Sequence, residues 1–120
     1  MQENYCSLRR WDVLKSQLNN LSPEEFYSKT QTEMNIILID VRTHSEYELY
    51  HLPNAINLDY LGDHFLENLE SLDKAANYYI YCRSGRRSVR VCTLMQNSGF
   101  LNLYNLDGGL NMLEAQSLLS

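Results

Sequence analysis

Short apolar runs alternate with amphipathic stretches along most of the chain. The run at 36–41, IILIDV, is continuous and rich in β-branched residues, a pattern typical of a strand buried on both faces of a parallel sheet. Further strands are predicted at 55–58, 78–82 and 101–106, and the stretches between them carry apolar residues at helical spacing. Strands that alternate with helices predict an α/β fold, in which a mostly parallel sheet is flanked by helices on both faces.

Two helix starts are marked by complete capping boxes. Ser22 can cap a helix that begins at Pro23, and Glu25 completes the box; Thr43 and Glu46 form the second box. The first helix is predicted to run to about Lys29, and the second is a short helix to about Leu49.

Three further helices are predicted in the second half of the chain, at 62–73, 86–97 and 110–119. Gly99 ends the middle one, and the turn DGG at 107–109 precedes the last.

The first twenty residues are predicted to form a separate helix. Leu8, Trp11, Leu14 and Leu18 recur at three- and four-residue spacings, which would place them on one apolar flank. We therefore expect a helical extension over 1–20 and a single α/β domain over 21–120.

Composition and charge exclude several classes of protein. At 120 residues, with 44% hydrophobic and 21% charged residues, the chain is typical of one globular domain. The formal net charge of -5 argues against general nucleic-acid binding, and no apolar run approaches the roughly 20 residues of a membrane span. The first residues lack the apolar core of a secretory signal, so we expect a cytoplasmic protein without membrane or nucleic-acid partners.

The three cysteines do not suggest a shared structural role. Cys6, Cys82 and Cys92 are odd in number and form neither a CxxC pair nor a compact ligand set with histidine, which argues against a disulfide framework and a zinc site. Cys92 is predicted to be a buried core thiol on the helix at 86–97, in preference to a resolving cysteine for Cys82.

The most distinctive stretch is CRSGRRS, at 82–88. Ligand sites in parallel sheets gather beyond the carboxyl ends of strands, and Cys82 falls at such an end. Gly85 permits a tight curl, and the helix that follows leaves backbone N–H groups and its positive end near the sulfur. These features, with three nearby arginines, favour a thiolate and the docking of an oxyanion beside it. The arginines are Arg83, Arg86 and Arg87.

From about Ser22 to Gln116 the chain resembles the rhodanese-like domain family. The matching segments are SPEEFYS, LIDVRTHSEYELYHLPNAINL and YYIYCRSGRRSVRVCTLMQNSGFLNLYNLDGG, in the family's order and spacing. The resemblance implies a rhodanese-like domain with a five-stranded parallel sheet and no cofactor or metal. It also implies a cysteine that accepts sulfane sulfur from an anionic donor such as thiosulfate and passes it to a thiol or cyanide, with a protein sulfur carrier as a further partner.

Carried over position by position, the resemblance makes Cys82 the nucleophile that forms a persulfide. It gives Asp40 and Arg42, which match the family's Asp-Val-Arg motif, a supporting role at the end of a strand; a structural ion pair away from the chemistry is the alternative. The residues expected to bind the substrate are Arg83, Ser84, Gly85, Arg86, Arg87 and Ser88.

Three positions depart from the family's pattern. Tyr50 and Asn54 stand where glycine is common, and Leu113 stands where tryptophan is common. Asparagine tolerates a positive φ, whereas Tyr50 suggests a rearranged turn and Leu113 a less aromatic pocket.

Two other functions compete with sulfur transfer. Some phosphatases resemble this fold and also hold a cysteine among backbone amides and arginine, but their loop is one residue longer, so the loop from Cys82 to Arg87 forms a smaller cradle. The other competitor is a non-catalytic rhodanese-like module that only binds partners; such modules tend to lack the cysteine that this chain keeps.

Overall fold

A computed structural model describes residues 10–116. Five strands form one sheet in the order β1-β5-β4-β2-β3, and every neighbouring pair is parallel. The strands are β1 (Asn19–Leu21), β2 (Ile36–Asp40), β3 (Ile56–Asn57), β4 (Asn77–Tyr81) and β5 (Asn102–Leu106). The helices that follow β1 along the chain are α2 (Pro23–Thr32), α3 (His44–Leu49), α4 (Phe65–Glu70), α5 (Arg86–Asn97) and α6 (Gly109–Ala115).

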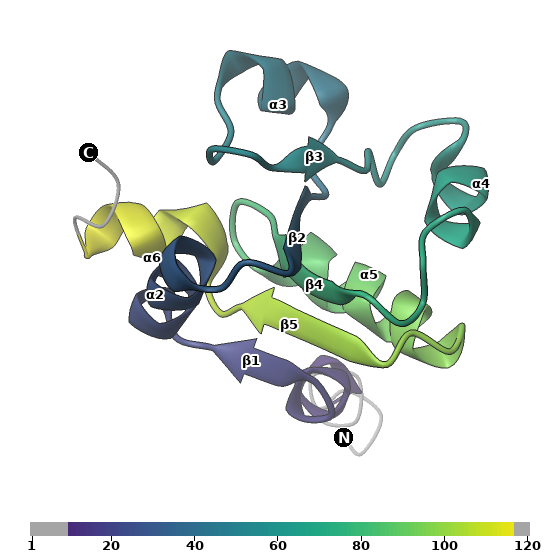
Figure 1. The fold of residues 1–120 in the computed structure, drawn as a ribbon, viewed down its shortest axis with the longest axis horizontal. Helices are drawn as coiled ribbons and strands as arrows, with labels where there is room; N and C mark the ends of the chain where they lie inside the picture. Colours follow the sequence, from purple (N-terminus) through teal and green to yellow (C-terminus); the bar gives the residue numbers. More distant parts are fainter. Residues whose placement is uncertain (1–9, 117–120) are drawn as a thin grey trace, which may run out of the picture.

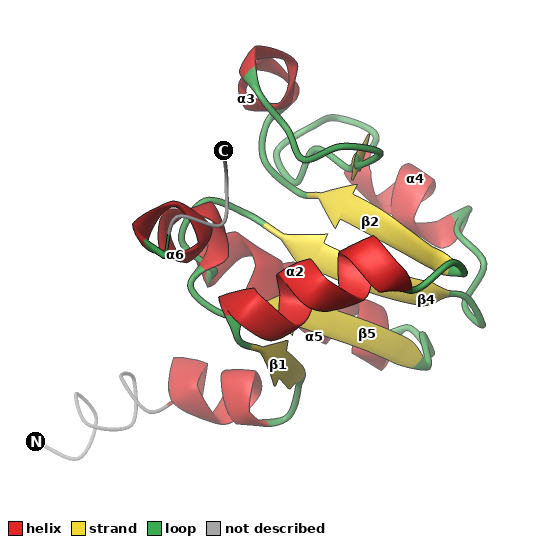
Figure 2. Ribbon diagram, turned by 60° about the vertical axis from the view of Figure 1, so that its left-hand side comes forward, coloured by secondary structure: helices red, strands yellow, loops and turns green. Residues whose placement is uncertain are grey.

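Helices cover both faces of the sheet, as the sequence predicts (Figures 1 and 2). Helices α2 and α6 lie together on one face, where Phe26, Leu110 and Leu113 pack in one core cluster with strand residues. Helices α4 and α5 lie on the other face, where Phe65 and Met95 belong to a second cluster. The sheet therefore lies between two apolar cores, and its carboxyl end is free for a site.

Local signals placed most helices correctly. Both capping boxes form: the Ser22 side chain accepts from the Glu25 N–H, and the Thr43 side chain accepts from the Glu46 N–H. Helix α5 has the predicted bounds, and Gly99 follows it with φ +95°. Helix α4 is shorter than the predicted 62–73.

The prediction of one helix over 1–20 is wrong at its end. Residues 10–16 are helical, but Asn19–Leu21 form strand β1 at the edge of the sheet beside β5. Polar residues hold this strand through distant partners: Asn19 Nδ2 donates to the Leu103 carbonyl at 3.1 Å, and Asn105 Nδ2 donates to Asn20 Oδ1 at 2.9 Å. Residues 1–9, including Cys6 and Leu8, lie outside the described part, and the division into 1–20 and 21–120 stays a prediction.

The strand ends set the position of the chemistry. Strands β2 and β4 pair in register from Ile36 with Asn77 to Asp40 with Tyr81. Cys82 therefore begins the loop that follows β4, close to the end of β2. Within residues 10–116, no helix combines the length and apolarity needed to cross a membrane.

Candidate active site

Cys82 lies in a cradle of backbone amides between β4 and α5. Its side chain is buried, and its Sγ accepts hydrogen bonds from the N–H of Gly85 at 3.0 Å and of Ser88 at 3.4 Å. The thiol donates to Ser88 Oγ at 3.5 Å, and that hydroxyl donates to the Gly85 carbonyl at 3.1 Å. Gly85 has φ +95°, a value that other residues rarely adopt. The sulfur thus lies at the positive end of a twelve-residue helix, with two donors directed at it.

Helix α6 holds the other side of this loop. The N–H groups of Leu110 and Asn111 donate to the carbonyls of Cys82 and Arg83, both at 2.9 Å. A Cβ on Gly109 would lie 2.5 Å from each of those carbonyl oxygens, and Gly109 has φ +64°. The loop can be held this closely only because glycine stands at 109.

The three arginines of the loop each have a partner in the described structure. Their charges are therefore not all free for a substrate, as the sequence alone suggested. The interactions are Arg83 with Glu114 at 2.8 Å, Arg87 with Glu46 at 3.1 Å, and Arg86 over the ring of Trp11 at 5.9 Å. The two ion pairs are roughly half exposed, so a bound anion can compete for these arginines.

Asp40 and Arg42 form a buried ion pair at the carboxyl end of β2. Arg42 donates to both oxygens of the Asp40 carboxylate, from Nε at 3.1 Å and from Nη2 at 2.8 Å. The Tyr81 hydroxyl donates to Asp40 Oδ2 at 2.9 Å and accepts from the Leu52 N–H, and Arg42 also donates to the Tyr50 carbonyl. The pair therefore ties the end of β2 to the segment after α3.

The charge of Arg42 is stabilised despite its burial. Desolvation opposes the charged guanidinium, but the hydrogen bond and negative charge of Asp40 outweigh it, and the pKa of Arg42 is raised. Within residues 10–116 neither side chain bonds to the loop 82–88; they reach it through Tyr81, the residue before Cys82. The described contacts are those of an ion pair that orders the end of β2; the supporting role and the structural alternative both stay predictions.

Cys92 is a core residue on α5. It has no exposed surface, and burial, with a smaller contribution from Cys82, raises the pKa of the Cys92 thiol. A buried thiol of this kind is unreactive, as the sequence predicts for this position.

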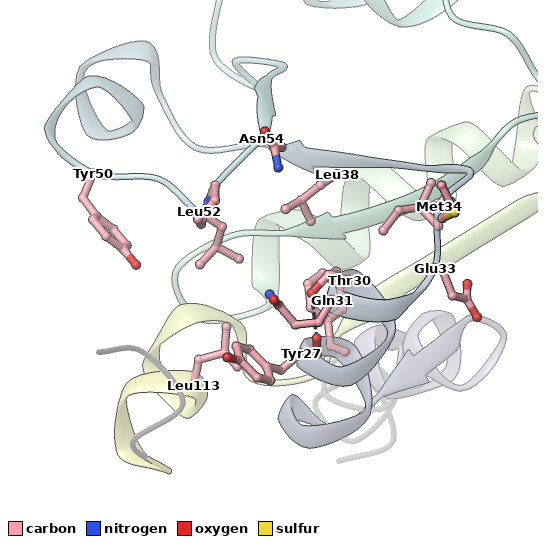
Figure 3. Close-up of a pocket in the computed structure, with 13 residues that line it drawn as sticks. Tyr27, Thr30, Gln31, Glu33, Met34, Leu38, Tyr50, Leu52, Asn54 and Leu113 are labelled. Atoms are coloured by element: carbon pink, nitrogen blue, oxygen red, sulfur yellow. Dashed lines mark hydrogen bonds between the residues drawn. The ribbon is translucent and has the colours of Figure 1, made fainter.

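A cavity of about 590 Å³ is lined by residues outside the Cys82 loop (Figure 3). No residue of the loop 82–88 lines it; its walls come from α2, the turn after α2, β2, the segment after α3, and Leu113 of α6. All three positions that depart from the family's pattern, Tyr50, Asn54 and Leu113, line this cavity. Asn54 has φ +68°, while Tyr50 has φ -168°, which is extended backbone that any residue adopts. Tyrosine therefore fits at 50 without strain.

The cavity predicts that Leu113→Trp is tolerated. The added rings can extend into open space, so the free energy of unfolding should change by less than about 1 kcal/mol in a urea titration. Leu110→Trp is the matched control, because Leu110 lies on the same helix and is buried as Leu113 is, but does not line the cavity. It should lose about 1–3 kcal/mol through overpacking. Equal losses in the two variants would show that the space beside Leu113 is not open.

Two contributors to the site were not identified from the sequence. Glu46 was noticed only as a capping residue, although it also pairs with Arg87. The backbone N–H groups that follow Gly109 were not recognised as supports of the Cys82 loop, although the turn DGG marked the place. Neither role has a local signal, because each partner is distant in the sequence.

Comparisons with known proteins show the family of this chain. The family model described as Rhodanese-like domain matches residues 22–116. The protein "Putative sulfurtransferase YtwF" of Bacillus subtilis is 32% identical over 101 residues, which are 84% of this chain and 95% of that protein. The tRNA sulfurtransferase of Thermoplasma acidophilum is 32% identical over 105 residues, 88% of this chain, but the match spans only 20% of that protein's length.

Solved structures show the same fold. A rhodanese-like domain protein from Staphylococcus aureus has a TM-score of 0.70 and 28% identity, over 79% of this chain and 90% of that one. The polysulfide-sulfur transferase homodimer of Wolinella succinogenes has a TM-score of 0.75 over 97% of this chain and 88% of that one; at 21% identity, this likeness concerns the fold alone. On the family match and these relatives, the chain belongs to the rhodanese-like domain family, which includes sulfurtransferases.

Proposed function

We propose that this protein is a sulfurtransferase that carries sulfane sulfur as a persulfide on Cys82. The observation that supports this function best is the position of the Cys82 sulfur at the start of α5. It accepts hydrogen bonds from the N–H groups of Gly85 and Ser88. Such donors stabilise negative charge on the sulfur, and a cysteine acts as a nucleophile through its thiolate. The same donors can stabilise the outer sulfur of a persulfide anion.

In the first half of the reaction, the Cys82 thiolate attacks the sulfane sulfur of the donor. With thiosulfate, the new S–S bond forms as the bond to the sulfonate breaks, and the electron pair of that bond leaves with sulfite. One thiolate and one thiosulfate dianion thus give a cysteine persulfide anion and a sulfite dianion, with no oxidant or reductant consumed. A persulfide donor reacts in the same way and leaves as a thiolate.

In the second half, an acceptor attacks the outer sulfur of the persulfide. A thiolate acceptor becomes a persulfide and cyanide becomes thiocyanate, and in each case the electron pair of the broken S–S bond returns to Cys82. A thiol on a carrier protein can serve as the acceptor by the same chemistry. The surface position of the loop, where Arg83 and Ser84 are exposed, favours access by an acceptor of any size.

The other residues of the loop are assigned roles by position. Gly85 and Ser88 supply the amides that contact the sulfur, and the Ser88 hydroxyl adds a third polar contact. Ser84 accepts from the Arg86 N–H at 3.5 Å, which supports the curl of the loop. The last role belongs to the three arginines of the loop. We assign to Arg83, Arg86 and Arg87 the attraction of an anionic donor toward Cys82.

The test of this function is the intact mass of the protein after incubation with thiosulfate or an organic persulfide. We expect a species heavier by one sulfur atom, with the added sulfur on the peptide that contains Cys82, and its loss on adding cyanide together with formation of thiocyanate. If no donor adds sulfur to Cys82, the chain is a binding module or, if it hydrolyses an aryl phosphate, a phosphatase.

A further inference from the structure

One carboxylate oxygen of Glu46 joins the capping box of α3 to the active-site loop. Glu46 Oε1 accepts from the Thr43 N–H at 3.0 Å, from the Thr43 hydroxyl at 3.0 Å and from Arg87 Nη1 at 3.1 Å. Helix α3 and the loop 82–88 are far apart in the sequence, so this contact is the product of the fold. It brings a negative charge to the edge of a site built to receive an anion.

The negative charge of Glu46 is firmly maintained. The hydrogen bond from the Thr43 N–H, followed by the Thr43 hydroxyl and Arg87, outweighs partial burial and lowers the pKa of the Glu46 carboxyl. Yet a capping box requires only an acceptor oxygen and is formed equally by glutamine. The charge is therefore not needed to begin α3, and its effect falls on Arg87.

This charge opposes the binding of highly charged donors. Arg87 has its Nη1 directed at Glu46, and Arg83 is paired with Glu114, so two of the three arginines of the loop already have a carboxylate partner. A donor that approaches Arg87 gains attraction from the guanidinium and meets repulsion from a carboxylate about 3 Å beyond it. The repulsion grows with the donor's charge, so it is larger for a dianion than for a monoanion.

We propose that Glu46 is a specificity-determining residue, whose carboxylate on Arg87 disfavours dianionic sulfur donors relative to less highly charged ones such as organic persulfides and thiosulfonates. This inference rests on the proposed transfer through Cys82. It names the class of donor the site is suited to: a sulfane sulfur attached to an organic group, with at most one negative charge near Arg87.

Two probes of similar shape separate charge from every other property of the donor. Methanethiosulfonate has a methyl group in place of one sulfonate oxygen of thiosulfate, so it has one negative charge instead of two. Attack by the Cys82 thiolate breaks its S–S bond, gives the same cysteine persulfide anion and releases methanesulfinate with the electron pair. A change in the reactivity of Cys82 itself affects both donors and cancels in the ratio of their kcat/KM values.

The experiment compares this ratio, thiosulfate over methanethiosulfonate, in the wild type and in Glu46→Gln. Removal of one charge close to a partly exposed site should raise the ratio roughly fivefold, mainly through a lower KM for thiosulfate. The increase should shrink as salt is added, because ions screen exposed charges. The matched control is Glu25→Gln, which removes the same charge from the capping box of α2, where Glu25 Oε1 accepts from the Ser22 N–H. It should leave the ratio unchanged.

A ratio that stays the same or falls in Glu46→Gln overturns the inference and makes Glu46 a positioning residue for Arg87. An equal increase of the ratio in Glu25→Gln also overturns the inference, because the effect would then come from the net charge of the protein only. These outcomes leave the proposed function in place, provided that methanethiosulfonate adds sulfur to Cys82 by intact mass. If neither donor adds sulfur to Cys82 in the wild type, the proposed function fails, and the assignment of Glu46 fails with it.

Discussion

Cys82→Ser is expected to abolish sulfur transfer while the domain stays folded. A serine hydroxyl can accept the same hydrogen bonds from the N–H groups of Gly85 and Ser88 that the sulfur accepts, so the loop keeps its shape. It cannot form a persulfide, and without a base beside it serine is a poor nucleophile at neutral pH. Transfer from thiosulfate to cyanide should fall below detection, the sulfur adduct should disappear from the intact mass, and the melting temperature should change little.

Cys92→Ser provides the matched control. Cys92 lies on α5 and is fully buried in the core, so a hydroxyl there must be taken out of water, at a cost of about 1–3 kcal/mol in the free energy of unfolding. Sulfur transfer by Cys92→Ser should persist when it is assayed well below the melting temperature of this variant. A sulfur adduct that is found on Cys92, or sulfur transfer that persists in Cys82→Ser, would contradict the assignment of Cys82 as the nucleophile.

Asp40→Asn is expected to give the largest loss of stability among the substitutions considered. The change leaves the guanidinium of Arg42, which is only 2% exposed, without its counter-charge. An amide also directs N–H groups where the carboxylate accepts from Arg42 and the Tyr81 hydroxyl. Breaking one half of a buried ion pair costs about 3–5 kcal/mol, a large part of the stability of a domain of this size.

The control is Asp107→Asn, which breaks the ion pair of Asp107 with Lys15 at the surface. That pair is partly exposed, so its loss should cost no more than about 1 kcal/mol. Free energies of unfolding from urea titrations of both variants decide the matter. A loss in Asp40→Asn no larger than in Asp107→Asn would mean that water reaches Arg42 in the folded protein.

The features predicted best from the sequence are those fixed by neighbouring residues. The capping boxes at Ser22 and Thr43, the buried strand β2, and the cysteine loop at the start of α5 all depend on contacts within a few positions. Local hydrogen bonds and hydrophobic periodicity encode such features directly. The amide cradle of Cys82 was expected for this reason, before any distance was known.

Features that depend on distant partners were missed. Strand β1 has the sequence NNL, which has no strand propensity of its own, and it is extended because β5 lies beside it. The ion pair of Arg87 with Glu46 likewise joins residues that are far apart in the sequence. Three of the seven residues in the loop are arginines, which suggested a strongly positive loop. Only the fold shows that carboxylates reduce this charge.

The contact between α6 and the Cys82 loop also orders events during synthesis of the protein. Cys82 leaves the ribosome before Leu110 and Asn111, whose N–H groups hold the carbonyls of Cys82 and Arg83. Strand β5, which lies between β1 and β4, is also made after the cysteine. A nascent chain therefore carries Cys82 on a loop that these N–H groups do not yet hold. The loop gains these contacts only when α6, the last helix of the described structure, has docked, so the cradle of Cys82 is completed late in synthesis.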